Sequence, residues 1–187
     1  MIAQRNFHHL QSSFRFAALL LMSISLLSMV GVAQAAIFEP GCSNGVGDTA
    51  ALQVAISTAN TNGAADTIQL VQGCTYTLTN SLNVNIADGF PLTIEGNDAT
   101  ISGNNSVRVL KILAGSTVIV NRTTLNKGFT DEPGNSDGEG AGIANEGTLT
   151  LTNSKVSGNL ATSGGGGGIL NDQGTLTLNK TTVSGNT

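Results

Sequence analysis

The sequence predicts an all-β fold, a parallel β-helix of stacked coils with one short α-helix capping its N-terminal end. Three observations lead to this prediction. Gly, Thr and Asn fill 63 of the 152 positions after residue 35, apolar residues alternate with Thr in short runs, and one segment near the C-terminus occurs twice with little change. This composition argues against a helical bundle or an ordinary α/β enzyme, because both need long runs of helix-forming residues.

Residues 1–35 have the pattern of a signal peptide. Arg5 and Arg15 precede an apolar run over residues 16–32, and Ala33-Gln34-Ala35 supplies a small-x-small cleavage site, so we expect a mature chain that begins at Ala36. An uncleaved membrane anchor is the alternative, but the run is at the short limit for a span. No later stretch is apolar enough to cross a bilayer. We therefore expect an exported protein, extracellular or associated with the outer membrane or cell surface.

Charge and residue types exclude several functions. Charged residues make up 11% of the chain, against roughly 25% in an average domain, and the residues after position 35 carry 6 basic and 12 acidic side chains. A nucleic-acid partner is therefore not expected. Both histidines, His8 and His9, lie in the leader. Their absence from the mature chain excludes Ser-His-Asp and Cys-His triads and ordinary zinc sites.

The two cysteines of the chain are Cys42 and Cys74. In an oxidising compartment they allow one bridge, which closes a loop of about 32 residues and contributes roughly 3–4 kcal/mol in the chain-entropy model. We expect this structural disulfide. A metal pair or a nucleophilic cysteine would need a nearby histidine.

Only residues 48–60 have a convincing helical pattern. Apolar residues recur there three and four positions apart, and Asp48 is placed as an N-cap. We expect residues 36–66 to form an N-terminal cap, in which this helix, held by the Cys42–Cys74 bridge, covers the apolar edge of the first coil. Its inward residues are expected to be Leu52, Ala55, Ile56 and Ala59.

After the helix, short alternating runs predict strands that are buried on one face and wet on the other. They are broken by Gly and Asn, which favour tight corners. The expected strands are Thr67–Val71, Thr75–Leu78, Leu92–Ile94, Val118–Val120, Leu149–Leu151 and Leu176–Leu178.

These strands belong to a repeat. Residues 142–151 recur as 168–178, with one residue inserted at the turn, and Val156-Ser157-Gly158-Asn159 recurs 27 residues later. Further back, the apolar pair Leu149/Leu151 maps onto earlier pairs that begin at Val118, Leu92 and Ile68. The steps from each pair to the one before it are 31, 26 and 24 residues.

A unit of this length cannot bury its apolar face alone, so neighbouring units must stack at about 4.8 Å to share one core. Neither a leucine-rich repeat nor a propeller blade fits the spacing. We expect coils over residues 67–187, with the last coil unfinished at Thr187 as if a longer array followed.

The blocks Gly140–Asn159 and Gly165–Asn186, together with the upstream stretch from Gly47, resemble right-handed parallel β-helix proteins exported by bacteria. These belong to the pectin-lyase-like superfamily and include polymorphic outer-membrane and autotransporter-passenger proteins. The resemblance covers the whole mature chain. It implies the fold and leaves the activity open, because the same scaffold carries lyases, glycosidases and adhesins.

The carboxylates are the candidates for chemistry. Glu146 and Asp172 fall at equivalent turns of adjacent coils, where a pair could serve as general acid and base or hold Ca²⁺, although two exposed acids in neighbouring turns are common. An acidic insertion, residues 131–139, accounts for the longest repeat period of 31 residues. It supplies further weak calcium candidates in Asp131, Asp137 and Glu139, but a solvated loop is the favoured interpretation. The motifs imply no cofactor other than this calcium.

Asparagines one period apart predict structural ladders of stacked amides, with Asn145 on Asn171 and Asn153 on Asn179. The sequence thus favours a non-enzymatic secreted or cell-surface repeat protein, a rigid scaffold for adhesion or envelope contact. Its partner would be an extracellular protein or glycan. A polysaccharide-active enzyme of the lyase or glycosidase kind, or an inert spacer, is the alternative.

Overall fold

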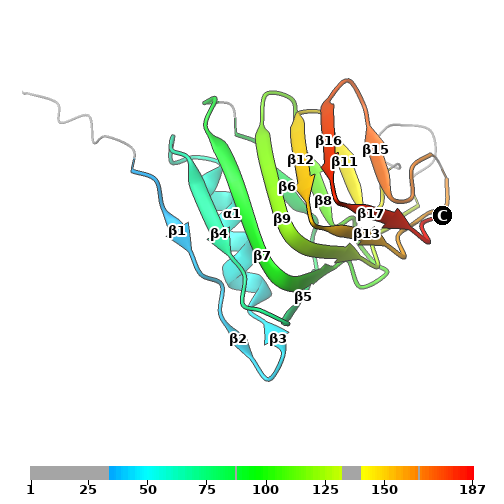
Figure 1. Cartoon of the computed structure of the whole chain (residues 1–187), viewed down its shortest axis with the longest axis horizontal. Helices are drawn as coiled ribbons and strands as arrows, with labels where there is room; N and C mark the ends of the chain where they lie inside the picture. The colour runs from blue at the N-terminus through cyan, green and yellow to red at the C-terminus, as the bar shows by residue number, and fades with distance from the viewer. Residues whose placement is uncertain (1–33, 87, 132–139, 164) are drawn as a thin grey trace, which may run out of the picture. The chain divides into compact units, whose positions relative to one another are not determined.

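The computed structural model describes residues 34–86, 88–131, 140–163 and 165–187. Their strands form a parallel β-solenoid of about five turns, as predicted, with α1 (Thr49–Ala59) near the N-terminus (Figure 1). Every strand pair in this part of the chain is parallel except one short hairpin near the N-terminus. The predicted leader, residues 1–35, falls almost wholly outside the described residues.

The largest sheet has two rows of strands joined by two long, bent strands, β7 (Pro91–Ser102) and β9 (Thr117–Asn126). The first row also holds β1 (Ile37–Phe38), β4 (Asp66–Gln69), β12 (Thr148–Thr152) and β16 (Thr175–Asn179). The second row also holds β2 (Cys42–Ser43), β3 (Val46–Gly47), β5 (Thr75–Thr77), β13 (Lys155–Ser157) and β17 (Thr182–Ser184).

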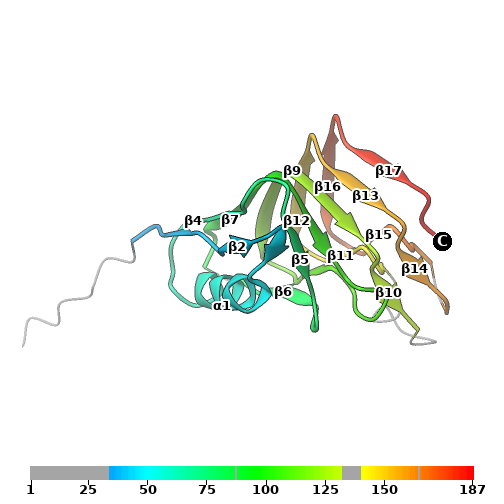
Figure 2. The ribbon, with the colours of Figure 1, turned by 90° about the horizontal axis from the view of Figure 1, so that it is seen from below.

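Two smaller sheets complete the coils. One contains β6 (Leu82–Val84), β8 (Leu110–Ile112), β11 (Ile143–Asn145) and β15 (Ile169–Asn171), and the other pairs β10 (Phe129–Thr130) with β14 (Leu160–Ala161). Figure 2, turned by 90° from Figure 1, shows the strands of successive coils following one another along the stack. Each strand of a coil therefore lies beside its counterpart in the coil before.

The strand register confirms the predicted periods for most of the stack. Leu176 pairs with Leu149, Leu149 with Val118, and Val118 with Leu92. The first coil differs from the prediction, because Ile68 pairs with Ile94 and not with Leu92. The physical reason is that a buried carboxylate, Asp66, takes the inward position opposite Leu92, where it accepts a hydrogen bond of 2.8 Å from the Ala36 N–H. The apolar pattern of this coil is therefore shifted by two residues.

One continuous apolar core runs from α1 to the fourth coil, from Leu52 to Val156. Its side chains come from alternate strand positions, while Thr and other polar residues point outward. Full burial of each Val, Leu or Ile contributes about 1.5–3 kcal/mol. In the last described coil Leu178 and Val183 are each 44% exposed, because β16 and β17 have a neighbouring coil on one side only.

The N-terminal cap covers the first coil. β1 pairs with β4, β3 pairs with β5, and α1 packs against β4, β5 and β6. The helix begins as predicted, with the Asp48 side chain accepting a hydrogen bond from the Ala51 N–H at 2.9 Å. The disulfide between Cys42 and Cys74 is present and ties the β2–β3 hairpin to the start of β5, which confirms that prediction.

Polar side chains hold the corners of the coils together. Asn159 Oδ1 accepts from the Gly128 N–H at 2.7 Å, and Asn186 Oδ1 accepts from the Asn159 N–H at 3.1 Å, so each amide reaches back to the preceding coil. At another corner Ser154 and Thr181 hydroxyls accept from N–H groups of the coil before in the same way. These contacts satisfy backbone groups that the strand ladder leaves unpaired.

We predict that Asn159→Ala lowers the free energy of unfolding by about 2–3 kcal/mol, because it leaves buried backbone groups of the preceding coil without partners. Asn159 is 1% exposed, and its Nδ2 also donates to the Leu125 carbonyl and to Asn186 Oδ1. Urea denaturation measures the loss. The matched control is Asn179→Ala, an exposed strand asparagine, which should change stability by less than about 0.5 kcal/mol. Equal losses in both variants would contradict the role of the corner amide.

Candidate functional site

The acidic pair predicted from the sequence lies at one corner of the stack. Asn145 pairs with Asn171 in the register of β11 and β15, so the residues that follow, Glu146 and Asp172, lie at equivalent turns of adjacent coils. Both line a cavity of about 290 Å³. Lys111 Nζ lies 3.7 Å from Glu146 Oε1. Two carboxylates in one cavity could assist proton transfer, but the ion pair with Lys111 already occupies one oxygen of Glu146.

Of the calcium candidates in the acidic segment 131–139, only Asp131 belongs to the described residues, where it is exposed at the edge of a surface depression. Asp137 and Glu139 lie outside the described residues. Within the described ranges, no three His, Cys, Asp or Glu side chains gather in a way that could hold a metal ion. The calcium prediction for Asp137 and Glu139 therefore stays a prediction.

The structure brings together one of the two predicted asparagine ladders. Asn145 is fully buried, and its Nδ2 donates to Asn171 Oδ1 at 2.6 Å and to the Thr175 carbonyl at 3.1 Å. The second pairing is wrong by one residue, since Thr152 and not Asn153 pairs with Asn179. The reason is Gln173, the extra residue in the last turn, which lengthens the period from 26 residues at β15 to 27 at β16.

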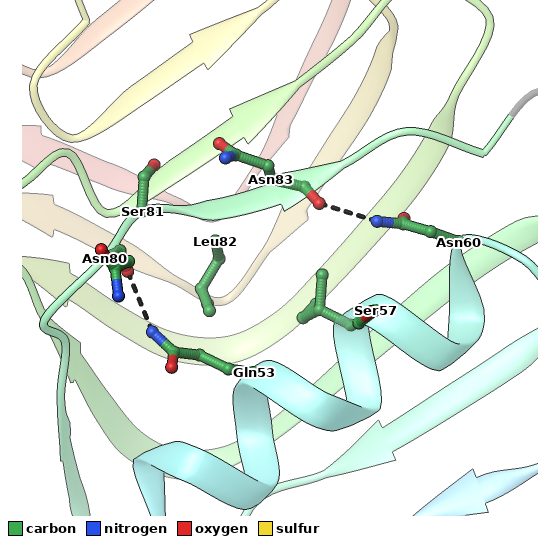
Figure 3. A pocket seen from close by; sticks show the side chains of 8 residues that line it. Gln53, Ser57, Asn60, Asn80, Ser81, Leu82 and Asn83 are labelled. Carbon is green, nitrogen blue, oxygen red and sulfur yellow. Dashed lines mark hydrogen bonds between the residues drawn. The ribbon is translucent and has the colours of Figure 1, made fainter.

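A polar groove that the sequence analysis did not predict lies between α1 and β6, the edge strand of the four-stranded sheet. Gln53 Nε2 donates to the Asn80 carbonyl at 3.3 Å, and Asn60 Nδ2 donates to the Asn83 carbonyl at 2.9 Å (Figure 3). These two hydrogen bonds hold the helix beside β6. A depression of about 310 Å³ lies between the helix and the strand. Leu82 lies at its centre in Figure 3 and is 1% exposed.

A second depression, of about 410 Å³, lies on the other side of the same strand and shares Asn80, Ser81 and Asn83 with the first. Arg108 and Lys111 also line it. Both cations are engaged, since Arg108 Nε donates to the Gly140 carbonyl at 3.1 Å and Lys111 pairs with Glu146. We call the two depressions together the β6 groove.

The sequence carried a signal for this groove that the repeat pattern concealed. Asn80-Ser81-Leu82-Asn83 reads as a corner between strands, because Asn and Ser favour turns. Gln53 and Asn60 lie two helical turns apart and therefore on one face of α1. What the sequence could not supply was the pairing of that face with β6, since Gln53 and Asn80 are 27 residues apart.

Comparison with family models, with curated proteins and with solved structures found no match to this chain. Among the residues that the structure describes, no helix is both long enough and apolar enough to cross a membrane. The fold is established by the register of the parallel strands.

Proposed function

We propose that this chain is an exported β-solenoid repeat protein, secreted or held at the cell surface, that serves as a rigid scaffold for adhesion or envelope contact. The single observation that carries the proposal is the continuous apolar core that joins the cap and four coils into one unit. Such a stack holds its outward polar side chains at fixed spacings, which suits an extended binding surface. Its partner would be an extracellular protein or glycan.

Two further features support export. The leader pattern at residues 1–35 is that of a signal peptide, and the Cys42–Cys74 disulfide is compatible with an oxidising compartment. The resemblance to exported β-helix proteins of the pectin-lyase-like kind agrees with both. The structure supports this resemblance in one respect, because its coils are built from parallel strands.

A polysaccharide-active enzyme is the second candidate, and one observation favours it. Glu146 and Asp172 line the same cavity, with Ala114 at its wall. Glycosidases act through a pair of acidic side chains that flank the scissile bond. The ion pair between Glu146 and Lys111 and the half-buried state of Asp172 describe a structural corner equally well.

Sugar release distinguishes the two candidates. The purified chain is incubated with polygalacturonate and other acidic glycans, with and without Ca²⁺, and the release of reducing or unsaturated ends is measured. We expect no turnover, together with binding to cells or to extracellular matrix. Turnover that is lost in Glu146→Gln and Asp172→Asn, with the fold intact by circular dichroism, would overturn the proposal in favour of the enzyme.

A further inference from the structure

Asp66 carries a carboxylate that is buried between the cap and the next coil. The residue is 2% exposed and stands at an inward position of β4, opposite the fully buried Leu92. No lysine or arginine side chain of the described part of the chain forms an ion pair with it. A buried charge without a partner is strongly destabilising, so this carboxylate needs a compensating group.

Only one of its two oxygens has a partner within the described residues. Oδ1 accepts a hydrogen bond from the Ala36 nitrogen at 2.8 Å, whereas Oδ2 is buried and accepts none. A backbone N–H supplies a single proton and no charge. The neutral amide therefore satisfies half of the carboxylate and leaves its charge unbalanced, which is uncommon for a buried polar group.

The Ala36 nitrogen is held in place by contacts on its C-terminal side. The Ala36 carbonyl accepts from the Thr67 N–H at 2.9 Å, and half-buried Phe38 packs against the core two residues further on. Figure 1 shows β1 alongside β4 at the N-terminal end of the stack. Gln34 and Ala35, by contrast, are exposed. The position of the nitrogen is thus fixed by the residues that follow it.

Ala36 is also the residue at which we expect the mature chain to begin, because the small-x-small site ends at Ala35. Its cleavage is a hydrolysis. Water adds across the peptide bond between Ala35 and Ala36, which leaves a carboxylate on the released leader and an amine on Ala36. An α-amine has an ordinary pKa of about 7.7–8.0, so at pH 7 it is mostly an ammonium group with three N–H donors and one positive charge.

We propose that Asp66 is the receptor for the α-ammonium group that processing creates at Ala36, and that this buried ion pair fastens β1 to the first coil. The inference rests on the export proposed above. The new charge arises at the atom that already lies 2.8 Å from Oδ1, so no rearrangement is needed. A hydrogen bond between two charged groups is roughly twice as strong as a neutral one. The cap therefore reaches its full stability only after the leader has been removed.

The test compares two forms of the chain, each with Asp or Asn at position 66. One form begins at Ala36, and the other retains Gln34 and Ala35, so that the Ala36 nitrogen is a neutral amide. Asp66→Asn keeps the size of the side chain and one oxygen acceptor but removes the charge. The melting temperatures of the four proteins are measured by circular dichroism.

In the form that begins at Ala36, Asp66→Asn should lower the melting temperature by about 5 °C or more, because it breaks the ion pair. In the extended form the same change should leave the melting temperature level or raise it, because it removes an unbalanced buried charge. The matched control is Glu39→Gln, an exposed acid of the same cap, which should shift either form by less than about 2 °C.

The contrast between the two forms decides the inference. A variant Asp66→Asn that fails to fold only when the chain begins at Ala36 would support it. Equal losses in both forms, or failure of both to fold, would overturn it, since Asp66 would then serve the backbone N–H alone.

The proposed export is tested separately by expressing the full chain with its leader in a bacterial host and measuring the intact mass of the exported product. We expect the mass of a chain that begins at Ala36. Retention of the leader would overturn the proposed export and this inference with it. Cleavage before Ala36 together with equal losses from Asp66→Asn would overturn this inference alone.

Discussion

Leu52→Asp should destabilise the protein by about 4 kcal/mol or more and cause it to aggregate. Leu52 is fully buried where α1 covers the first coil. The substitution loses the packing of a buried leucine, worth about 2–5 kcal/mol on truncation, and places a carboxylate in an apolar site. Once the cap detaches, the edges of β4, β5 and β6 are free to pair with other chains. Urea denaturation and sedimentation velocity measure the two effects.

Val54→Asp is the matched control for this prediction, because Val54 lies on the same helix and is 64% exposed. It should alter stability by no more than about 0.5 kcal/mol, as surface changes usually do, and should leave the protein monodisperse. A Leu52→Asp protein that remained as stable and as monodisperse as Val54→Asp would show that the helix does not act as a cap.

Removing the disulfide with the double change Cys42→Ala and Cys74→Ala should cost about 3–4 kcal/mol, as expected for a closed loop of 32 residues. The loss should be concentrated in the cap, since the bridge joins the β2–β3 hairpin to the first coil. Hydrogen exchange checks this, with amides of α1 exchanging faster while those of β12 change less.

Dithiothreitol supplies the control for the disulfide. Reduction should lower the stability of the unaltered chain to that of the double variant and should have no effect on the double variant itself. If the double variant matched the oxidised chain in denaturant midpoint, the bridge would have no role in stability.

Much of the fold could be predicted because its signals are local or periodic. The helix was expected at 48–60 and spans Thr49–Ala59, since the Asp48 cap and the spacing of its apolar residues lie within one segment. The repeat near the C-terminus fixed the register of β12 and β16, because its two copies differ by one inserted residue. That same residue explains the error at Asn153, where a period of 26 was carried past a turn that makes it 27.

The remaining elements escaped prediction for a different reason. Strands such as β6, β8 and β14 have two or three residues each and lie among Gly, Asn and Ser, so periodicity has too few positions to reveal them. The first coil was misaligned because a buried aspartate, Asp66, stands where the pattern requires an apolar residue. The β6 groove depends on contact between a helix and a strand that share no repeat. The sequence could indicate the polar residues of the groove, but not that those of α1 would lie against β6.

The corner amides and hydroxyls have a consequence for how such a protein can change over generations. Asn159 and Asn186, like Ser154 and Thr181, each satisfy groups in the coil before them. A duplicated coil thus brings with it the side chains that complete its predecessor, and a deletion of one whole period removes donors and acceptors in matched sets. Gene duplication in steps of one coil can then alter the length of the stack without leaving a defect at the junction, whereas an inserted residue within a strand would turn the side chains that follow it to the wrong face.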